Sequence, residues 1–210
     1  MIDLYTWTTP NGRKVSILLE EIDETYHVVP IDISQGKQHE PSFRAINPNG
    51  KIPAIVDHDA EGGPLAVFES GAILIHLAEK HGRFLAAKPR ARAEALEWLM
   101  FQIAGIGPFL GQVNYWMNTA PEKNPAAMQR YLDEAVRLME VFDTGLTDKE
   151  YIAGEYSIAD MAAYPWVEAA WGPFSAILPQ KVEQMPNVTA WLARLGSREA
   201  VQRGMAVPKV

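Results

Sequence analysis

The chain contains 210 residues, 48% of them hydrophobic, and carries a formal net charge of −7 at pH 7. This length and composition suffice for one large domain or two small ones with a sizeable buried core. An acidic chain lacks the basic face that phosphate binding requires, so we expect no nucleic-acid partner. The absence of cysteine excludes disulfides, a thiolate nucleophile and thiolate metal sites.

Signals for targeting and for metal binding are also missing from the sequence. A basic segment followed by an apolar run is not found, and no stretch is long enough to span a bilayer, so we expect a cytosolic protein without a membrane partner. No two of the five histidines show the i,i+4 spacing of a helical metal site, and we therefore expect no metal ion.

The first 84 residues alternate between strand and helix patterns. Strands are predicted over Ile2–Trp7, Tyr26–Ile33, Ala54–His58 and Leu65–Phe68, and helices over residues 11–24 and 69–81. The polar residues 34–46 are expected to form a loop and a short helix. Because the turn at Glu61-Gly62-Gly63 is short enough for a hairpin, the predicted order is βαβ followed by ββα.

After Phe84 the pattern changes, and only helices are predicted. They begin near Pro89 and at Ser157, and two others cover residues 124–146 and 187–195. Ser157 is a suitable N-cap, and Asp160 can reach back to its backbone N–H to form a variant of the capping box. The sequence thus predicts an α/β domain over residues 1–84 and an all-helical domain over residues 89–210.

Several longer stretches resemble a known family. The segments INPNGKIPAIVD (residues 46–57), VFESGAILIHLAEKHG (residues 67–82) and YSIADMAAYPW (residues 156–166) are similar to the cytosolic glutathione transferases. The resemblance covers nearly the whole chain and implies a thioredoxin-like domain followed by a helical one. The stretches TPNGRKV, NPNGKIPAIVDH and GPFLGQ look most like the bacterial nu-class members, which use glutathione to reduce disulfides. The resemblance therefore implies glutathione, reduced or as its disulfide, as the cofactor.

In a chain without cysteine, the reactive thiol would come from the bound glutathione. The stretch from Leu4 to Lys14 reads as a strand, a turn and the start of a helix, and the turn is where a redox Cys-x-x-Cys motif would lie. The free N–H groups and positive dipole end of that helix favour thiolate, and Thr9 and Asn11 can donate hydrogen bonds to sulfur. The alternative is that these residues only cap the helix. We expect Tyr5, inside the strand, to be a packing residue.

The resemblance also implies how the rest of the peptide is held. Ile52-Pro53 matches a cis-proline whose preceding backbone pairs with the cysteinyl residue, although an ordinary trans proline is the alternative. Glu69 would bind the ammonium and Ser70 the carboxylate of the γ-glutamyl end, unless they only cap the helix. Gln38 and Lys51 would contact the glycine carboxylate, with a solvated lysine as the alternative.

The helical domain would complete the site. Arg130 matches an arginine that approaches the sulfurs of bound glutathione in the nu-class proteins, and the alternative is a surface ion pair with Glu134 four residues later. Asn114, Tyr115 and Trp116 are expected to line the pocket for the second substrate. Related sequences often carry histidines in this stretch, and this chain does not. This difference bears on the identity of the second substrate more than on the binding of glutathione.

The leading hypothesis is therefore a glutathione-dependent thiol–disulfide oxidoreductase that acts on a small-molecule disulfide. One alternative is conjugation of glutathione to an electrophilic carbon, and another is a non-catalytic scaffold with the same fold. The resemblance also implies a homodimer.

Overall fold

The structure, a computed structural model, describes residues 1–210. It divides into two compact units, a sheet unit of residues 1–85 and 196–210 and a helical unit of residues 86–195. None of its helices combines the length and the apolar character needed to cross a membrane.

The sheet unit contains a four-stranded mixed sheet in the order β2-β1-β3-β4. The strands are β1 (Ile2–Thr6), β2 (Tyr26–Pro30), β3 (Ala54–Asp57) and β4 (Leu65–Phe68). Strand β1 pairs in parallel with β2 and antiparallel with β3, and β3 pairs antiparallel with β4. This is the βαβ–ββα order that the sequence predicts, and each strand lies within the range expected for it.

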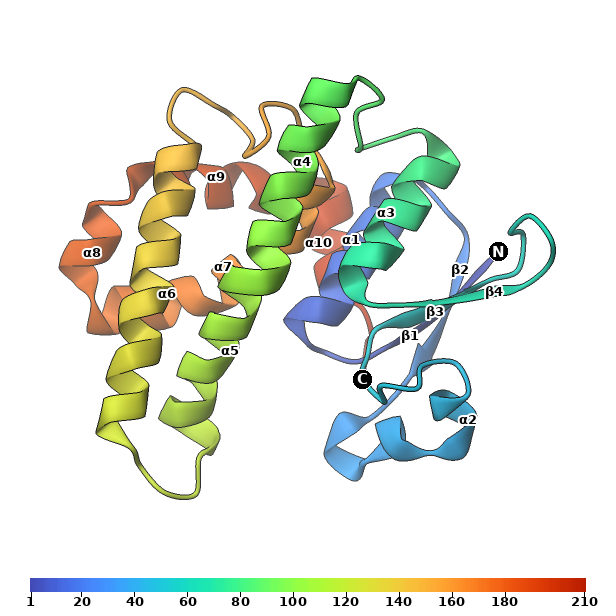
Figure 1. The fold of residues 1–210 in the computed structure, drawn as a ribbon, viewed down its shortest axis with the longest axis horizontal. Helices are drawn as coiled ribbons and strands as arrows, with labels where there is room; N and C mark the ends of the chain where they lie inside the picture. Colours follow the sequence, from blue (N-terminus) through green and yellow to red (C-terminus); the bar gives the residue numbers. More distant parts are fainter. The chain divides into compact units, whose positions relative to one another are not determined.

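Helices cover both faces of this sheet. They are α1 (Pro10–Glu21), α2 (Pro41–Arg44) and α3 (Ser70–His81), with two 3₁₀ turns, η1 (Ile33–Gln35) and η2 (Lys37–His39), before α2. Figure 1 shows α1 and α3 on one side of the sheet and α2 on the other. The fully buried apolar residues come mainly from α1, α3, β1 and β3, as with Leu18, Leu77, Leu4 and Ile55. The helical spacing seen in the sequence therefore marks the core.

The last helix, α10 (Glu199–Met205), belongs to the sheet unit and packs against α1. Ser16 Oγ donates a hydrogen bond of 2.7 Å to the Gly204 carbonyl. The two helices can approach this closely because position 204 is glycine; a Cβ there would lie 2.5 Å from the Ile17 Cα. The sequence-based division assigned residues 196–210 to the helical domain, and this long-range contact explains the difference.

The helical unit contains six α-helices and two π-helical turns and has no strand, as expected. These are α4 (Pro89–Phe101), η3 (Gln102–Ile106), α5 (Gly107–Asn114), η4 (Tyr115–Thr119), α6 (Pro125–Gly145), α7 (Ile158–Ile177), α8 (Pro179–Glu183) and α9 (Pro186–Gly196). The π-helical turns η3 and η4 lie at the two ends of α5 and were not foreseen from the sequence.

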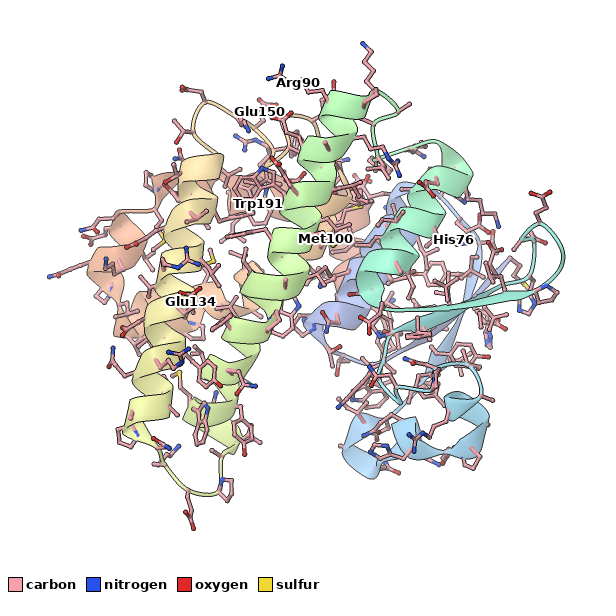
Figure 2. All side chains as sticks on the ribbon, in the orientation of Figure 1. His76, Arg90, Met100, Glu134, Glu150 and Trp191 are labelled. Carbon is pink, nitrogen blue, oxygen red and sulfur yellow. The ribbon has the colours of Figure 1, made fainter.

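A buried carboxylate, Asp160, joins three segments of the helical unit. The Ser157 side chain caps α7 and the Ser157 N–H donates to Asp160 Oδ2 at 3.1 Å, which confirms the predicted capping box. The other oxygen accepts hydrogen bonds from the Ile152 N–H at 3.0 Å and from Trp191 Nε1 at 2.8 Å. Trp191 is fully buried inside this unit (Figure 2). Burial raises the pKa of Asp160 to about 6, although the hydrogen bonds oppose this effect.

Candidate glutathione site

A pocket of about 220 Å³ lies on the sheet unit, where loops meet the first turns of α1 and α3. Eight residues line it: Asn11, Asn47, Asn49, Lys51, Ile52, Pro53, Glu69 and Ser70. All but the two asparagines at 47 and 49 are among the site residues predicted from the sequence. Three stretches that are distant along the chain are thus brought to one place.

The α1 end of the pocket begins with a capped helix. Thr9 has an extended backbone, and its side-chain oxygen accepts a hydrogen bond of 3.3 Å from the Gly12 N–H. Thr9 therefore caps α1, and this capping uses only an acceptor lone pair, so the hydroxyl proton is left available for donation. Asn11 follows within the first turn and is half-buried at the pocket wall. The turn can cap α1 and still present polar hydrogens to a ligand.

Gly12 fixes this turn against the sheet. A Cβ at this position would lie 2.3 Å from Thr6 Oγ1 and 2.7 Å from the Trp7 carbonyl oxygen. Only glycine therefore lets the start of α1 approach the end of β1 so closely.

Tyr5 lies in β1 and does not line this pocket. Its ring packs against the Phe43 ring with a centroid distance of 6.0 Å. Burial raises the pKa of Tyr5, and the charge of Asp3 adds to this effect. These contacts agree with a packing role within the strand.

The loop before β3 is folded around a buried asparagine. Asn47 is only 2% exposed; its Nδ2 donates to the Lys51 carbonyl at 2.5 Å and its Oδ1 accepts from the Asn49 N–H at 3.0 Å. Gly50, with φ of 63°, supplies the left-handed residue that the turn needs. The loop ends at a cis peptide between Ile52 and Pro53, as the resemblance implied. Asn47 was not identified from the sequence, although its Asn-Pro-Asn-Gly setting is typical of a turn.

The third part of the pocket is the junction of β4 and α3. Glu69 is exposed and has a positive φ of 67°, an uncommon conformation for a residue other than glycine. Ser70 begins α3 and is buried, and the N–H groups of this first turn have no partner within the helix. A carboxylate side chain and a helix N-terminus are therefore adjacent at one end of the pocket.

A buried lysine lies beneath this junction and was missed by the sequence-based reasoning. Lys14, in α1, is 1% exposed, and its Nζ donates to Ser70 Oγ at 3.5 Å. Burial lowers the pKa of Lys14 to about 7, and the charge of Glu69 partly opposes this effect. No local pattern in the sequence marks the burial of Lys14, so only the tertiary packing reveals it.

Two predicted binding residues differ in their relation to the pocket. Lys51 lines it and is exposed. Gln38 lies in η2 and does not line it, but its carbonyl oxygen would be 3.1 Å from a Cβ at position 50, so it adjoins the loop that does. Gln38 Nε2 lies 3.3 Å from His39 Nε2.

The remaining predicted residues belong to the helical unit. Arg130 is exposed in α6, and Glu134, labelled in Figure 2, forms hydrogen bonds of 2.8 and 2.7 Å with Arg137. The alternative for Arg130, a surface ion pair with Glu134, is not formed in the structure, where Glu134 pairs with Arg137. Tyr115 and Trp116 form an edge-to-face ring pair, with centroids 5.2 Å apart, at the start of η4.

Comparisons with known proteins agree with this arrangement. The family model described as "Glutathione S-transferase, N-terminal domain" matches residues 1–79, and that described as "Glutathione S-transferase, C-terminal domain" matches residues 125–194. The Disulfide-bond oxidoreductase YfcG of Escherichia coli (strain K12) is 45% identical over 98% of this chain and 94% of its own length.

Two solved structures are also similar. A glutathione transferase family member from Pseudomonas fluorescens pf-5, with two glutathione bound, has a TM-score of 0.94 and 44% identity over 99% of this chain and 93% of that chain. A glutathione transferase from Pseudomonas putida, with one glutathione disulfide bound per subunit, has a TM-score of 0.94 and 41% identity over 99% of this chain and 91% of that chain. Together with the two family models, these likenesses establish that the chain belongs to the glutathione transferase family.

Proposed function

We propose that the protein is a glutathione-dependent thiol–disulfide oxidoreductase in which bound glutathione supplies the reactive thiol. The observation that carries this proposal is the pocket of the sheet unit, where a capped helix N-terminus, a cis-proline loop and a Glu-Ser helix start converge in a chain without cysteine. The disulfide-bond oxidoreductase at 45% identity and the solved relatives with glutathione or its disulfide support it.

In this proposal the tripeptide lies along the pocket. The γ-glutamyl carboxylate binds to Ser70 and the first N–H groups of α3, because helix N-termini favour anions, and the adjacent ammonium pairs with Glu69. The cysteinyl backbone pairs with that of Ile52, in the manner of an added strand. Lys51 and Gln38 hold the glycine carboxylate.

The thiol then lies at the start of α1. The positive end of this helix stabilises an anion, and hydrogen bonds from the Thr9 hydroxyl and the Asn11 amide stabilise a thiolate further. The resulting lower pKa raises the thiolate fraction at neutral pH, while a moderate shift retains nucleophilicity. A cation such as Arg130 would stabilise charge on the sulfurs during exchange, and Asn114, Tyr115 and Trp116 would form the wall for the second substrate.

The reaction proceeds by two displacements. The glutathione thiolate attacks one sulfur of the substrate disulfide, the S–S bond breaks, and one substrate thiolate leaves and takes up a proton. A second glutathione thiolate attacks the glutathione sulfur of the mixed disulfide and releases the other substrate thiolate. The two glutathiones thereby supply two electrons and become glutathione disulfide. No protein side chain is modified.

A comparison of two reactions tests this function. We expect the enzyme to reduce a small dialkyl disulfide with glutathione. The kcat/KM of this reaction should lie well above the kcat/KM for conjugation of glutathione to an aryl halide. The reduction is measured by coupling the glutathione disulfide that forms to a reductase. A conjugation rate far above the rate of disulfide reduction would contradict the proposal, and no binding of glutathione at millimolar concentration would favour a scaffold.

We further propose that the enzyme is a cytoplasmic homodimer. Strand β4 carries exposed apolar side chains, with Leu65 44% and Phe68 37% exposed, and an apolar surface of this kind is suited to a subunit contact. Sedimentation of the wild-type protein and of a Phe68→Glu variant tests this: a dimer that becomes a monomer in the variant is expected, and a wild-type monomer at micromolar concentration would contradict it.

A further inference from the structure

Asn47 is a buried polar residue to which the proposed exchange reaction assigns no part. It is 2% exposed and lies three residues after α2, in the loop that leads to β3. Its backbone is bonded on both sides: the Asn47 N–H donates to the Phe43 carbonyl at 2.9 Å, and the Asn47 carbonyl accepts from the Gly50 N–H at 2.9 Å. Phe43 is itself buried, so the asparagine is attached to the packed part of the sheet unit.

The side chain of Asn47 extends this arrangement to the end of the loop. Its Oδ1 accepts from the Asn49 N–H at 3.0 Å, and its Nδ2 donates to the Lys51 carbonyl at 2.5 Å. Asparagine can make both bonds because its amide carries an acceptor and a donor. The second bond reaches the residue directly before Ile52, whose backbone the proposed function pairs with the cysteinyl residue of glutathione.

The bond to the Lys51 carbonyl also determines the direction of the Ile52 N–H. These two groups belong to one planar peptide unit, and that unit is trans, so they point in opposite directions. With the carbonyl held by Asn47, the N–H faces away from Asn47. Ile52 is half-buried at the wall of the pocket, and its N–H has no acceptor in the protein. A backbone N–H in this state is ready to donate to a ligand.

We propose that Asn47 is a positioning residue for glutathione: it holds the peptide unit between Lys51 and Ile52 so that the Ile52 N–H can donate to the cysteinyl carbonyl. The inference rests on the proposed function. It adds that affinity for the tripeptide and ionisation of its sulfur depend on separate parts of the pocket, the Asn47 loop and the turn with Thr9 and Asn11. A bond to a non-reacting carbonyl is equally strong before and during the reaction, so its loss raises KM and leaves kcat unchanged.

Two variants separate the hydrogen bonds of Asn47. Asn47→Ala removes both side-chain bonds. Asn47→Asp keeps an acceptor for the Asn49 N–H, but an ionised carboxylate cannot donate to the Lys51 carbonyl. We expect the Kd for S-methylglutathione, measured by calorimetry, to rise about tenfold in both variants, because each releases the peptide unit that presents the Ile52 N–H.

Kinetics distinguish a positioning role from a general loss of structure. With glutathione and a small dialkyl disulfide, both variants should raise the KM for glutathione by about tenfold and change kcat by less than about twofold. The pKa of the bound thiol should be the same as in the wild-type complex, whereas Thr9→Val should raise it. A decrease in kcat at unchanged KM, or a raised thiol pKa in the Asn47 variants, would contradict the proposal.

Asn187→Ala is the matched control for lost stability. Asn187 belongs to the helical unit, and its Nδ2 also donates to a backbone carbonyl, that of Asp143, at 3.1 Å. This variant should unfold at a lower temperature than the wild-type protein, as should Asn47→Ala, but it should bind S-methylglutathione with unchanged Kd. Equal weakening of binding in Asn187→Ala and Asn47→Ala would show that destabilisation alone accounts for the effect, and would overturn the role of Asn47.

Amide hydrogen exchange of the wild-type protein tests the orientation without any substitution. The Ile52 N–H should exchange rapidly in the free protein and at least about tenfold more slowly with saturating S-methylglutathione. Protection of this N–H in the free protein, or no protection by the bound probe, would overturn the proposal even if the Asn47 variants did not fold.

The outcomes also separate the inference from the function on which it rests. If the wild-type protein binds S-methylglutathione and either Asn47 variant binds it equally tightly, the role of Asn47 is wrong and glutathione binding stands. A wild-type protein that does not bind the probe at all would contradict both the inference and the proposed function.

Discussion

Replacement of Asp160 by alanine is expected to destabilise the helical unit strongly. The carboxylate accepts hydrogen bonds from the Ile152 N–H, Trp191 Nε1 and both the N–H and Oγ of Ser157, at 2.8 to 3.3 Å. Each buried donor left without an acceptor costs about 1–3 kcal/mol, and removal of the desolvated charge offsets part of the sum. The expected net loss for Asp160→Ala at pH 7 is about 2–4 kcal/mol in the free energy of unfolding.

The asparagine variant separates the hydrogen bonds from the charge. Asp160→Asn keeps one acceptor oxygen, so we expect a loss of about 1–2 kcal/mol at pH 7. Because the folded pKa of Asp160 is raised to about 6, its protonation stabilises the wild-type fold at low pH, and that contribution disappears as pH rises through 6. The difference between wild type and Asp160→Asn should therefore be larger at pH 5 than at pH 7 by about 1 kcal/mol.

Denaturant unfolding at both pH values, followed by tryptophan fluorescence and circular dichroism, measures these differences. Asp133→Ala is the matched control, because Asp133 is exposed on α6 and its carboxylate accepts a hydrogen bond from the exposed Gln129. We expect it to change stability by less than about 0.5 kcal/mol. If Asp160→Ala were within about 1 kcal/mol of this control, the account of the buried network would be refuted.

Two further predictions concern the sheet unit and its site. Gly204→Ala should lower the free energy of unfolding by about 1–3 kcal/mol, because the added methyl meets the α1 backbone. Gly111→Ala, at a helical position in α5 where the added methyl would make only an ordinary contact of 3.4 Å with the Trp166 ring, should be neutral or stabilising in the same melt, and equal effects would contradict this. Thr9→Val and Asn11→Ala should each reduce kcat/KM for disulfide reduction by about tenfold. In both variants the thiol of bound glutathione should have a higher pKa than in the wild-type complex. An unchanged pKa of this thiol would exclude a role for these residues in ionising the sulfur.

Much of the sheet unit could be predicted from local sequence patterns. The apolar run of β1 and the helical spacing of Val15 and Leu18 reflect burial of these residues in the core, and such patterns can be read from a single sequence. Ser157 and Asp160 were recognised as a capping box because both partners lie within one turn of chain. Elements whose determinants are close in sequence were found correctly.

Other features depend on contacts between distant segments. The attachment of α10 to the sheet unit depends on Gly204 meeting Ile17, and no period in the last fifteen residues indicates that contact. Asn47 is buried where it closes its own loop, and Lys14 is buried with its amine 3.5 Å from Ser70 Oγ at the start of α3. A polar residue whose burial is imposed by tertiary structure reads as a surface residue in the sequence.

The resemblance to glutathione transferases supplied what local patterns could not. A cis bond at Pro53 is a minority state for any proline, and only the likeness to known proteins favoured it. The same likeness indicated Glu69 and Ser70, which line the pocket with Asn11. The π-helical turns beside α5 were not predicted from the sequence, because a π-turn has no clear sequence signature.

The most direct test of the central claim is the position of the sulfur in a crystal of the protein with glutathione disulfide bound. We predict that one sulfur lies within about 3.5–4 Å of Thr9 Oγ or Asn11 Nδ2, at the N-terminus of α1. A complex in which both sulfurs point away from this turn, with neither side chain within reach, would contradict the claim that the protein activates a thiol carried by its cofactor.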